Sequence, residues 1–256
     1  MKKTLLASLT VVLASASFAQ IKYVDKVLTA DKIKVTKDVT YGDNYTVLTG
    51  TPTLTSKVSM APGYGFVAMT ADIYEPLDGA SNRPLIIFSH SGSFLPRYSN
   101  NSPVGYKDDS ATVAMCKAWA RKGYVVMAPT YRMGWNPIAT TEDVRRETII
   151  NAAYKGVQDL SAAIRFLKDE AVVLGNFNGL DTGKIAIGGQ GTGSYITSAF
   201  ASLNTQDEIR IDKFRRSSDG SVMVDDQIWG DRFGMGGLPG FNNENWPGYE
   251  ANAQVA

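Results

Sequence analysis

The clearest pattern in the chain is an apolar stripe at helical spacing. Apolar side chains recur at alternating intervals of three and four positions, which places them on one face of an amphipathic helix. The stripe consists of Ile150, Ala153, Val157, Leu160, Ile164 and Leu167. A weaker stripe around Cys116 predicts a second helix over residues 110–121, and residues 195–203 predict a third.

Short apolar runs at residues 84–88, 124–128 and 184–187 predict strands. The first two runs are continuous rather than alternating, as expected for strands that are buried on both faces. Because these strands alternate with helices, the pattern predicts βαβ units and a mostly parallel sheet covered by helices. Residues 33–47, interrupted at 42–44, and the run 66–74 predict additional antiparallel strands near the N-terminus.

In a sheet of this kind, ligands bind at the carboxyl ends of the parallel strands. The loops that follow the three predicted strands lie at 89–94, 130–136 and 188–194. We therefore expect these loops to converge on one site, to which Tyr131 and Gln190 contribute side chains.

Three segments in this order resemble the esterase- and lipase-like branch of the α/β-hydrolase superfamily. They are residues 72–94, which include His90-Ser91-Gly92-Ser93, residues 118–134, which include Tyr131-Arg132, and residues 179–187. The resemblance is strongest over residues 66–203. It implies a three-layer α/β-hydrolase-type fold and a carboxylic-ester-hydrolase ancestry. It also implies that 90–93 is the oxyanion loop, which is His-Gly-Gly-Gly or a close variant in the family.

The chain departs from the family at the nucleophile elbow. The family motif is Gly-x-Ser-x-Gly, whereas this chain has Gly189-Gln190-Gly191-Thr192-Gly193. Gly191 has no side-chain atom that could attack a carbonyl carbon, so nucleophilic catalysis from this position is excluded. Thr192 and Ser194 carry hydroxyls, but they lie off the apex. We expect them to cap the following helix rather than to act in catalysis.

The triad also lacks its histidine. The family order is nucleophile, acid and then histidine, but the single histidine of this chain is His90, upstream of the elbow. His90 is left with two roles, lining the pocket or holding the loop backbone. No residue is therefore assigned a catalytic role. The remaining pocket and oxyanion candidates all lie in the converging loops. They are His90, Ser91, Gly92, Ser93, Gln190, Thr192 and Tyr131.

The two ends of the chain differ from the middle. Lys2 and Lys3 precede an uncharged, mostly apolar stretch, and small residues follow at Ser17 and Ala19. This order is typical of a cleaved signal peptide over 1–19, which predicts a secreted or periplasmic protein with no membrane span after cleavage. The predicted domain is 20–256. Its part 204–256 is loose, with short strands at 221–224 and 227–229, and we expect it to be lid-like or truncated, so that the fold is incomplete at its C-terminus.

Composition narrows the set of ligands. Lys and Arg number 26 against 25 Asp and Glu, so the sequence has no electrostatic signature of a nucleic-acid-binding protein. The single cysteine and single histidine give no zinc-ligand set, and Cys116 is expected to be a core thiol. We expect no cofactor or metal and a small-molecule or ester-like ligand.

Three functions remain open at this point. The first is an esterase-like protein without its triad, and the second is a non-catalytic ligand-binding domain on the same fold. The third is a dinucleotide-binding oxidoreductase, because Gly189-x-Gly191-x-x-Ser194 resembles a Gly-x-Gly-x-x-Gly fingerprint. This third signal is weak, since Asp207 follows a predicted helix rather than the second strand that the fingerprint requires.

Overall fold

The computed structural model describes residues 22–47, 64–172, 175–176 and 179–234. The predicted signal peptide and the last part of the predicted loose tail lie outside the described residues. None of the described helices is long and apolar enough to span a membrane.

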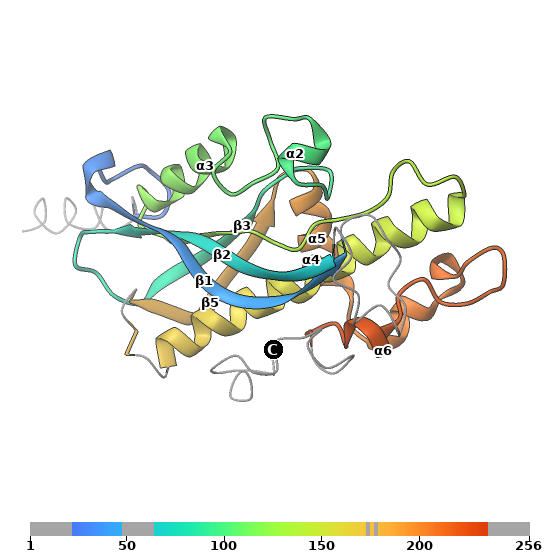
Figure 1. The fold of residues 1–256 in the computed structure, drawn as a ribbon. Coiled ribbons are helices and arrows are strands. Elements are labelled where there is room, and N and C mark those ends of the chain that lie inside the picture. The colour runs from blue at the N-terminus through green and yellow to red at the C-terminus, as the bar shows by residue number, and fades with distance from the viewer. Residues whose placement is uncertain (1–21, 48–63, 173–174, 177–178, 235–256) are drawn as a thin grey trace, which may run out of the picture.

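The described strands form one five-stranded sheet in the order β1-β2-β4-β3-β5. Strand β1 (Ile33–Val47) pairs with β2 (Tyr64–Pro76) antiparallel, and β2 pairs with β4 (Val125–Pro129) antiparallel. Strands β4, β3 (Arg83–Ser89) and β5 (Leu180–Gly189) are mutually parallel. This arrangement, visible in Figure 1, confirms the predicted parallel strands with antiparallel strands before them.

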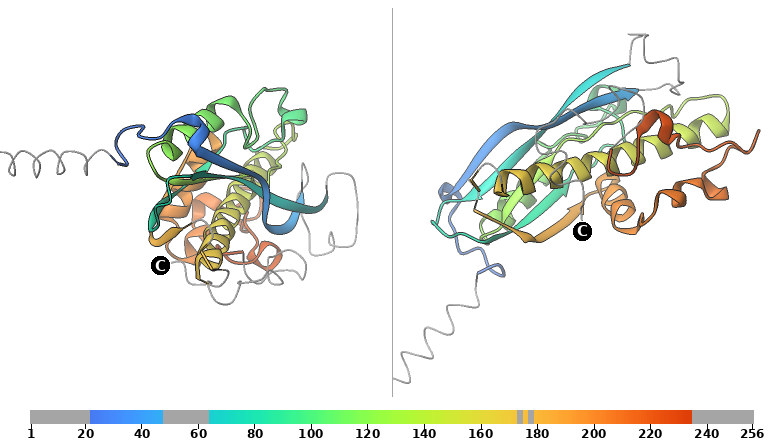
Figure 2. Two further views of the ribbon diagram at one scale, coloured as in Figure 1. Left: turned by 90° about the vertical axis from the view of Figure 1, so that its left-hand side faces the viewer. Right: turned by 90° about the horizontal axis from the view of Figure 1, so that it is seen from below.

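Helices cover both faces of the sheet. Helix α3 (Ser110–Ala120) packs on one face, and α4 (Glu142–Val172) and α5 (Thr192–Ser202) pack on the other. The left view of Figure 2 shows α3 and α4 on opposite sides of the strands. The remaining helical segments are short. They are η1 (Ala30–Lys32), α2 (Arg97–Asn100), η3 (Gln206–Arg210), η4 (Asp212–Phe214) and α6 (Asp226–Trp229).

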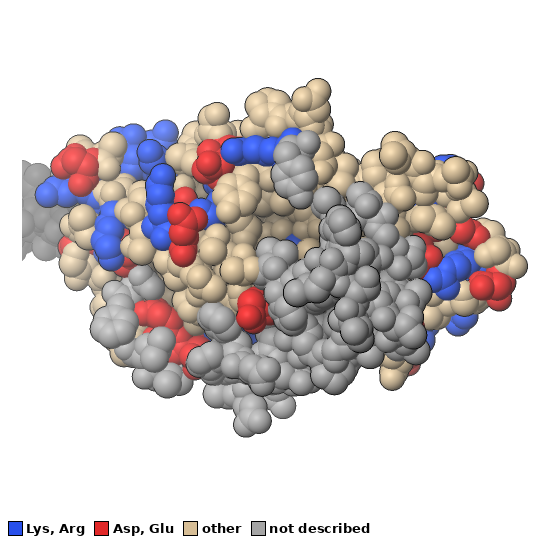
Figure 3. Space-filling model, in the orientation of Figure 1, with Lys and Arg blue, Asp and Glu red and all other residues tan. Residues whose placement is uncertain are grey.

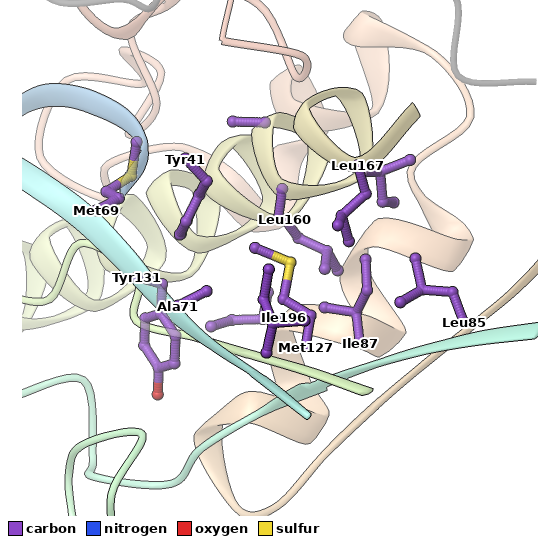
Figure 4. Close-up of a cluster of buried hydrophobic side chains, with 14 of the residues drawn as sticks. Tyr41, Met69, Ala71, Leu85, Ile87, Met127, Tyr131, Leu160, Leu167 and Ile196 are labelled. Carbon is purple, nitrogen blue, oxygen red and sulfur yellow. The ribbon is translucent and has the colours of Figure 1, made fainter. Parts of the chain in front are cut away.

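The side chains of each strand alternate between the two faces of the sheet, so that both faces pack against helices. In β4, Val125 and Met127 face the cluster under α4, whereas Val126 and Ala128 face the cluster under α3. Side chains alternate in this way because successive residues of a strand point to opposite faces. Figure 4 shows Leu85, Ile87 and Met127 of the sheet beside Leu160 and Leu167 of α4. The apolar stripe of α4 therefore faces the sheet, as its spacing predicts.

On the α3 face, Cys116 is fully buried in the second cluster. Burial raises the pKa of its thiol to about 12, so the thiolate is disfavoured. The expectation that Cys116 is a core thiol is confirmed.

A buried ion pair holds the loop after β4 against α4. Asp159 accepts hydrogen bonds from the Arg132 backbone N–H at 2.6 Å and from Arg132 Nε at 2.7 Å, and both side chains are 0% exposed. Arg132 Nη2 also donates to Gln158 Oε1 at 2.8 Å. Tyr131, the residue before Arg132, is fixed in place by this contact.

Three details differ from the sequence expectations. Strand β1 is continuous across residues 42–44, because register shifts near Thr40 and Gly42 absorb the irregularity that was predicted as a break. Residues 184–187 belong to the longer strand β5, which lies at the edge of the sheet and is only partly buried. Within the described residues no strand pairs with the outer edge of β5.

The third difference lies in the tail. Residues 227–229 form the single-turn helix α6 rather than a strand, and the Asp225 side chain caps it by accepting from Gln227 N–H. Of the predicted strand 221–224, only an isolated bridge between Val222 and Arg215 is present. Trp229 is 1% exposed, so this part of the tail is packed onto the domain.

Candidate functional site

The turn from β5 into α5 has the shape of an elbow with Gly191 at its apex. Gly191 has φ 55° and ψ −120°, a conformation that L-residues with a side chain rarely adopt. It is exposed to solvent and directly precedes the first residue of α5. The sharp strand-to-helix turn is therefore present without the serine that the family motif places there.

The flanking glycines are required by close backbone approach. A Cβ on Gly193 would lie 2.7 Å from the carbonyl oxygen of His90 and 2.6 Å from the carbonyl carbon of Ser89. A Cβ on Gly189 would lie 2.8 Å from the backbone nitrogen of Ser194. The Gly193 contacts arise because Ser89 and Gly189 are paired at the ends of two adjacent parallel strands, whereas the Gly189 contact lies within the turn itself. The elbow and the loop after β3 are thereby held side by side.

The loop after β3 turns through three successive positive φ angles. These are 134° at Gly92, 57° at Ser93 and 55° at Phe94. Asn100 Nδ2 donates to the Gly92 carbonyl oxygen at 3.1 Å, and Trp135 Nε1 donates to the Ser93 carbonyl oxygen at 2.7 Å. The strained backbone is thus fixed by hydrogen bonds from side chains outside the loop.

His90 is a buried component of this loop. Its side chain is 0% exposed, its Nδ1 is hydrogen-bonded to the Ser91 carbonyl oxygen, and its ring stacks on Tyr131 with centroids 4.4 Å apart. Burial lowers the pKa of the imidazole to about 4, so His90 is neutral at pH 7. Its Nε2 is buried and has no hydrogen-bond partner within the described residues. Of its two predicted roles, this environment favours the structural one.

Tyr131 joins the loop after β3 to the start of α5. Its hydroxyl donates to the His90 carbonyl oxygen at 2.9 Å and lies 3.0 Å from Thr192 Oγ1. Burial raises the pKa of Tyr131 above its ordinary value, so the phenol remains protonated. The hydroxyls of Thr192 and Ser194 therefore have internal partners, since Ser194 Oγ donates to the Gly189 carbonyl oxygen at 2.8 Å. Neither hydroxyl caps α5, contrary to the sequence expectation.

Ser91 lies directly in front of the apex. A Cβ built on Gly191 would overlap Ser91 Oγ and would lie 3.1 Å from Ser91 Cβ. Ser91 is half-buried, and within the described residues its Oγ makes no hydrogen bond. The hydroxyl beside the apex therefore comes from the opposite loop rather than from the elbow. The remaining candidates, Gln190 and Ser93, are exposed at the rim.

An open apolar groove of about 800 Å³ extends from the elbow along the α3 face of β5. Its walls include Phe88 of β3 and Met115 and Trp119 of α3. At the elbow end it reaches Gln190, Gly191 and Ser194, so the groove is continuous with the apex.

Charge is distributed without a dominant sign. Figure 3 shows Lys and Arg side chains interspersed with Asp and Glu side chains on one face. The described residues contain no cluster of three or more His, Cys, Asp or Glu side chains arranged to hold a metal ion. Asp109, a carboxylate of the neighbouring loop, is buried and accepts from Arg97 and from the Gly105 backbone N–H rather than from His90.

Sequence reasoning missed two features of this site. Asn100 belongs to a polar loop with no recognisable pattern, so nothing in the sequence marks it as the residue that holds Gly92. The contact between Ser91 and Gly191 did have a signal, because the family pattern has a small residue at 91 and a hydroxyl at 191. The sequence alone does not show that these two positions are in contact.

Three comparisons relate the chain to known proteins. The BD-FAE family model matches residues 71–246. A search of the curated proteins gave no match. Among solved structures, an esterase from Thermogutta terrifontis (Est2) is 24% identical over 52% of this chain and 39% of its own, with a TM-score of 0.34. Brefeldin A esterase, a bacterial homologue of human hormone-sensitive lipase, is 15% identical over 67% of this chain and 35% of its own, with a TM-score of 0.40.

A bacterial heroin esterase is 20% identical over 78% of this chain and 46% of its own, with a TM-score of 0.41. The chain thus spans less than half the length of each of these three structures. The dinucleotide-binding alternative gains no support from the family model.

Proposed function

Because this chain belongs to the BD-FAE family of α/β-hydrolase proteins and has a glycine at its elbow apex, we propose that it binds a ligand there without serine-triad catalysis. The observation that carries the proposal is the state of His90, the single imidazole of the sequence. The His90 side chain is buried and neutral, and its Nδ1 donates a hydrogen bond to the Ser91 carbonyl oxygen. A triad base must accept a proton from the nucleophile and be oriented by an acid, and His90 has neither partner in the described residues.

The chemistry of the ligand follows from the two ends of the site. The Gly193 N–H at the start of α5 donates to the Gln190 carbonyl oxygen at 3.0 Å, which leaves the Thr192 N–H as the donor for a ligand. It lies at the positive end of the helix dipole and favours a carbonyl or carboxylate oxygen at the apex. The adjoining groove is lined by Phe88, Met115 and Trp119 and accommodates an apolar body. We therefore propose an amphiphilic carboxylate or ester as the ligand, with its oxygen at the elbow and its chain in the groove.

Catalysis is tested with the purified mature chain and 4-nitrophenyl butyrate. We expect no saturable hydrolysis and no labelling by a fluorophosphonate, which reacts with activated serines. The variant G191S tests whether only the nucleophile is missing, and we expect it to remain inactive because no second histidine exists in the sequence. Saturable hydrolysis by the wild-type chain that a fluorophosphonate abolishes would contradict the proposal.

Binding is tested with butyrate, hexanoate and octanoate in ligand-observed NMR. Affinity is expected to rise about three- to fourfold for each methylene that enters the groove. M115E places a negative charge on an exposed position of the groove wall and is expected to weaken octanoate binding, whereas M115Q serves as the neutral control. Equal affinities for the three acids, or no binding at all, would rule out the proposed ligand class.

We also propose that the chain is exported. The support is the order of Lys2, Lys3, the apolar stretch and Ala19 at the N-terminus. N-terminal sequencing of the protein expressed from its full reading frame should find Gln20 as the first residue. An unprocessed Met1 in the soluble cell fraction would exclude cleavage at this site.

A further inference from the structure

The space in front of Gly191 is closed by a side chain rather than by backbone. The Cβ that would overlap at this position meets Ser91 Oγ, with Ser91 Cβ at 3.1 Å. At Gly193, by contrast, the blocking atoms are carbonyl groups of Ser89 and His90. Backbone atoms cannot be removed by substitution, but the Ser91 hydroxyl can. A side chain at 191 therefore requires Ser91 Oγ to move aside, in addition to a backbone with positive φ.

The hydroxyls around the elbow differ in whether they are available to a ligand. Thr192 Oγ1 is paired with the Tyr131 hydroxyl at 3.0 Å, and Ser194 Oγ donates to the Gly189 carbonyl oxygen at 2.8 Å. Ser91 Oγ makes no hydrogen bond within the described residues and lies beside the exposed apex. A ligand oxygen can therefore pair with Ser91 Oγ without breaking a hydrogen bond inside the protein.

We infer that Ser91 is the ligand-binding hydroxyl of this site, occupying from the loop after β3 the space that a side chain at 191 would take. Ser91 Oγ donates a hydrogen bond to the carboxylate or carbonyl oxygen of the ligand, and the N-terminus of α5 holds the same group from the other side. No bond to Ser91 forms or breaks, and no proton is transferred. The inference names the contact residue of the proposed function and rests on it.

The spatial part of this inference is tested by a double-mutant cycle that needs no ligand. G191S should lower the melting temperature strongly, because its side chain overlaps Ser91 and its φ is positive. G79S is the matched control, since Gly79 has φ 72° and a Cβ added there would have nothing within 4 Å, so it reports the cost of φ alone. Adding S91G to G191S should recover most of the loss beyond that of G79S. Simple additivity of S91G and G191S would overturn the placement of Ser91.

The binding part is tested with octanoate and the variant S91A. Loss of a hydrogen bond to a charged oxygen should weaken binding about tenfold, whereas S99A, at an exposed serine of α2, should bind as the wild type does. Equal octanoate affinities of S91A and the wild type would overturn the inference while leaving the proposed function in place. If the wild type binds no carboxylate although the cycle shows coupling, the proposed function fails and only the steric relation of Ser91 and Gly191 stands. Labelling of Ser91 by a fluorophosphonate would show a nucleophile and contradict the inference.

Discussion

At the scale of single residues, the imidazole of His90 is bound within the loop, whereas a catalytic base would have to be free to accept a proton. His90 donates to its neighbour's carbonyl oxygen and is sealed under Tyr131, with the ring planes inclined by 16°. An imidazole in such a place stabilises the loop in its neutral form and opposes protonation. The same burial that removes His90 from catalysis makes the fold sensitive to acid.

This sensitivity gives the first prediction. The pKa of His90 is about 4 in the folded chain against 6.5 for an exposed histidine, so between these values the unfolded chain binds more protons. Stability should therefore fall as the pH decreases from 6.5 to 4, by about 3 kcal/mol from this residue in full. H90N keeps a side-chain N–H donor but cannot titrate. Urea unfolding of both proteins at pH 7.5 and 4.5 measures the difference.

Carboxylates also titrate in this range, so only the difference between the two proteins is informative. The wild type should lose more stability than H90N on acidification. Parallel losses would mean that His90 is accessible to protons in the folded chain.

A second residue-scale prediction concerns the ion pair beneath Tyr131. D159N removes the charge that compensates Arg132, with both side chains 0% exposed, and should cost about 3–5 kcal/mol of unfolding free energy. D207N is the control, because the Asp207 side chain is 90% exposed beside Arg210 and its change should stay within about 0.5 kcal/mol. Denaturant unfolding measures both. Similar values for the two variants would show that the Arg132 charge is solvated.

At the scale of elements, sequence patterns predict the long and regular parts. The stripe ending at Leu167 predicts α4 because a helix of this length repeats its period many times. The run 84–88 predicts β3 because a buried strand needs apolar side chains on both faces. Residues 227–229 are too few to distinguish the helical repeat from the strand repeat. The structure has a helix there, which the Asp225 side chain caps. The edge position of β5 depends on which strands surround it, and no local pattern contains that information.

The elbow is predictable in its residue types but not in its contacts. Gly189 and Gly193 are evident as small residues at a tight turn. The atoms that exclude a side chain at Gly193 are carbonyl groups of Ser89 and His90, whereas at Gly189 they are backbone atoms of the elbow itself. Likewise, Ser91 is visible in the sequence as a departure from the family loop. Its position before Gly191 depends on the pairing of β3 with β5, which brings together residues far apart in the chain.

The elbow gives an element-scale prediction. G193A forces a Cβ to within 2.7 Å of the His90 carbonyl oxygen, so β3 and α5 must separate. Substitutions that overpack a rigid site typically cost 1–3 kcal/mol, and about 3 kcal/mol or more is expected here because backbone is the obstacle. G188A is the matched control, since its Cβ would meet only Phe88 Cδ2 at an ordinary 3.7 Å. Thermal unfolding compares the two, and equal melting temperatures would refute the close approach.

At the scale of the whole molecule, near-neutral charge and the exposed edge of β5 act together. The chain has a formal net charge of +1, so electrostatic repulsion between copies is small. Strand β5 presents unpaired backbone groups at the edge of the described sheet, beside a groove lined by Phe88, Met115 and Trp119. An unprotected strand edge next to apolar surface favours association with another strand.

We therefore expect the purified chain to self-associate through β5 as its concentration rises. Ala186 is exposed on this strand at the groove, so A186K introduces a charge where a second copy would pair and should weaken self-association. T140K adds the same charge at an exposed position outside the strand and the groove, and it controls for net charge. Light scattering after size-exclusion chromatography over a concentration series measures the mass of all three proteins. If A186K and T140K reduce the mass equally, net charge rather than the β5 edge governs association, because only A186K alters the surface on which two strands would meet.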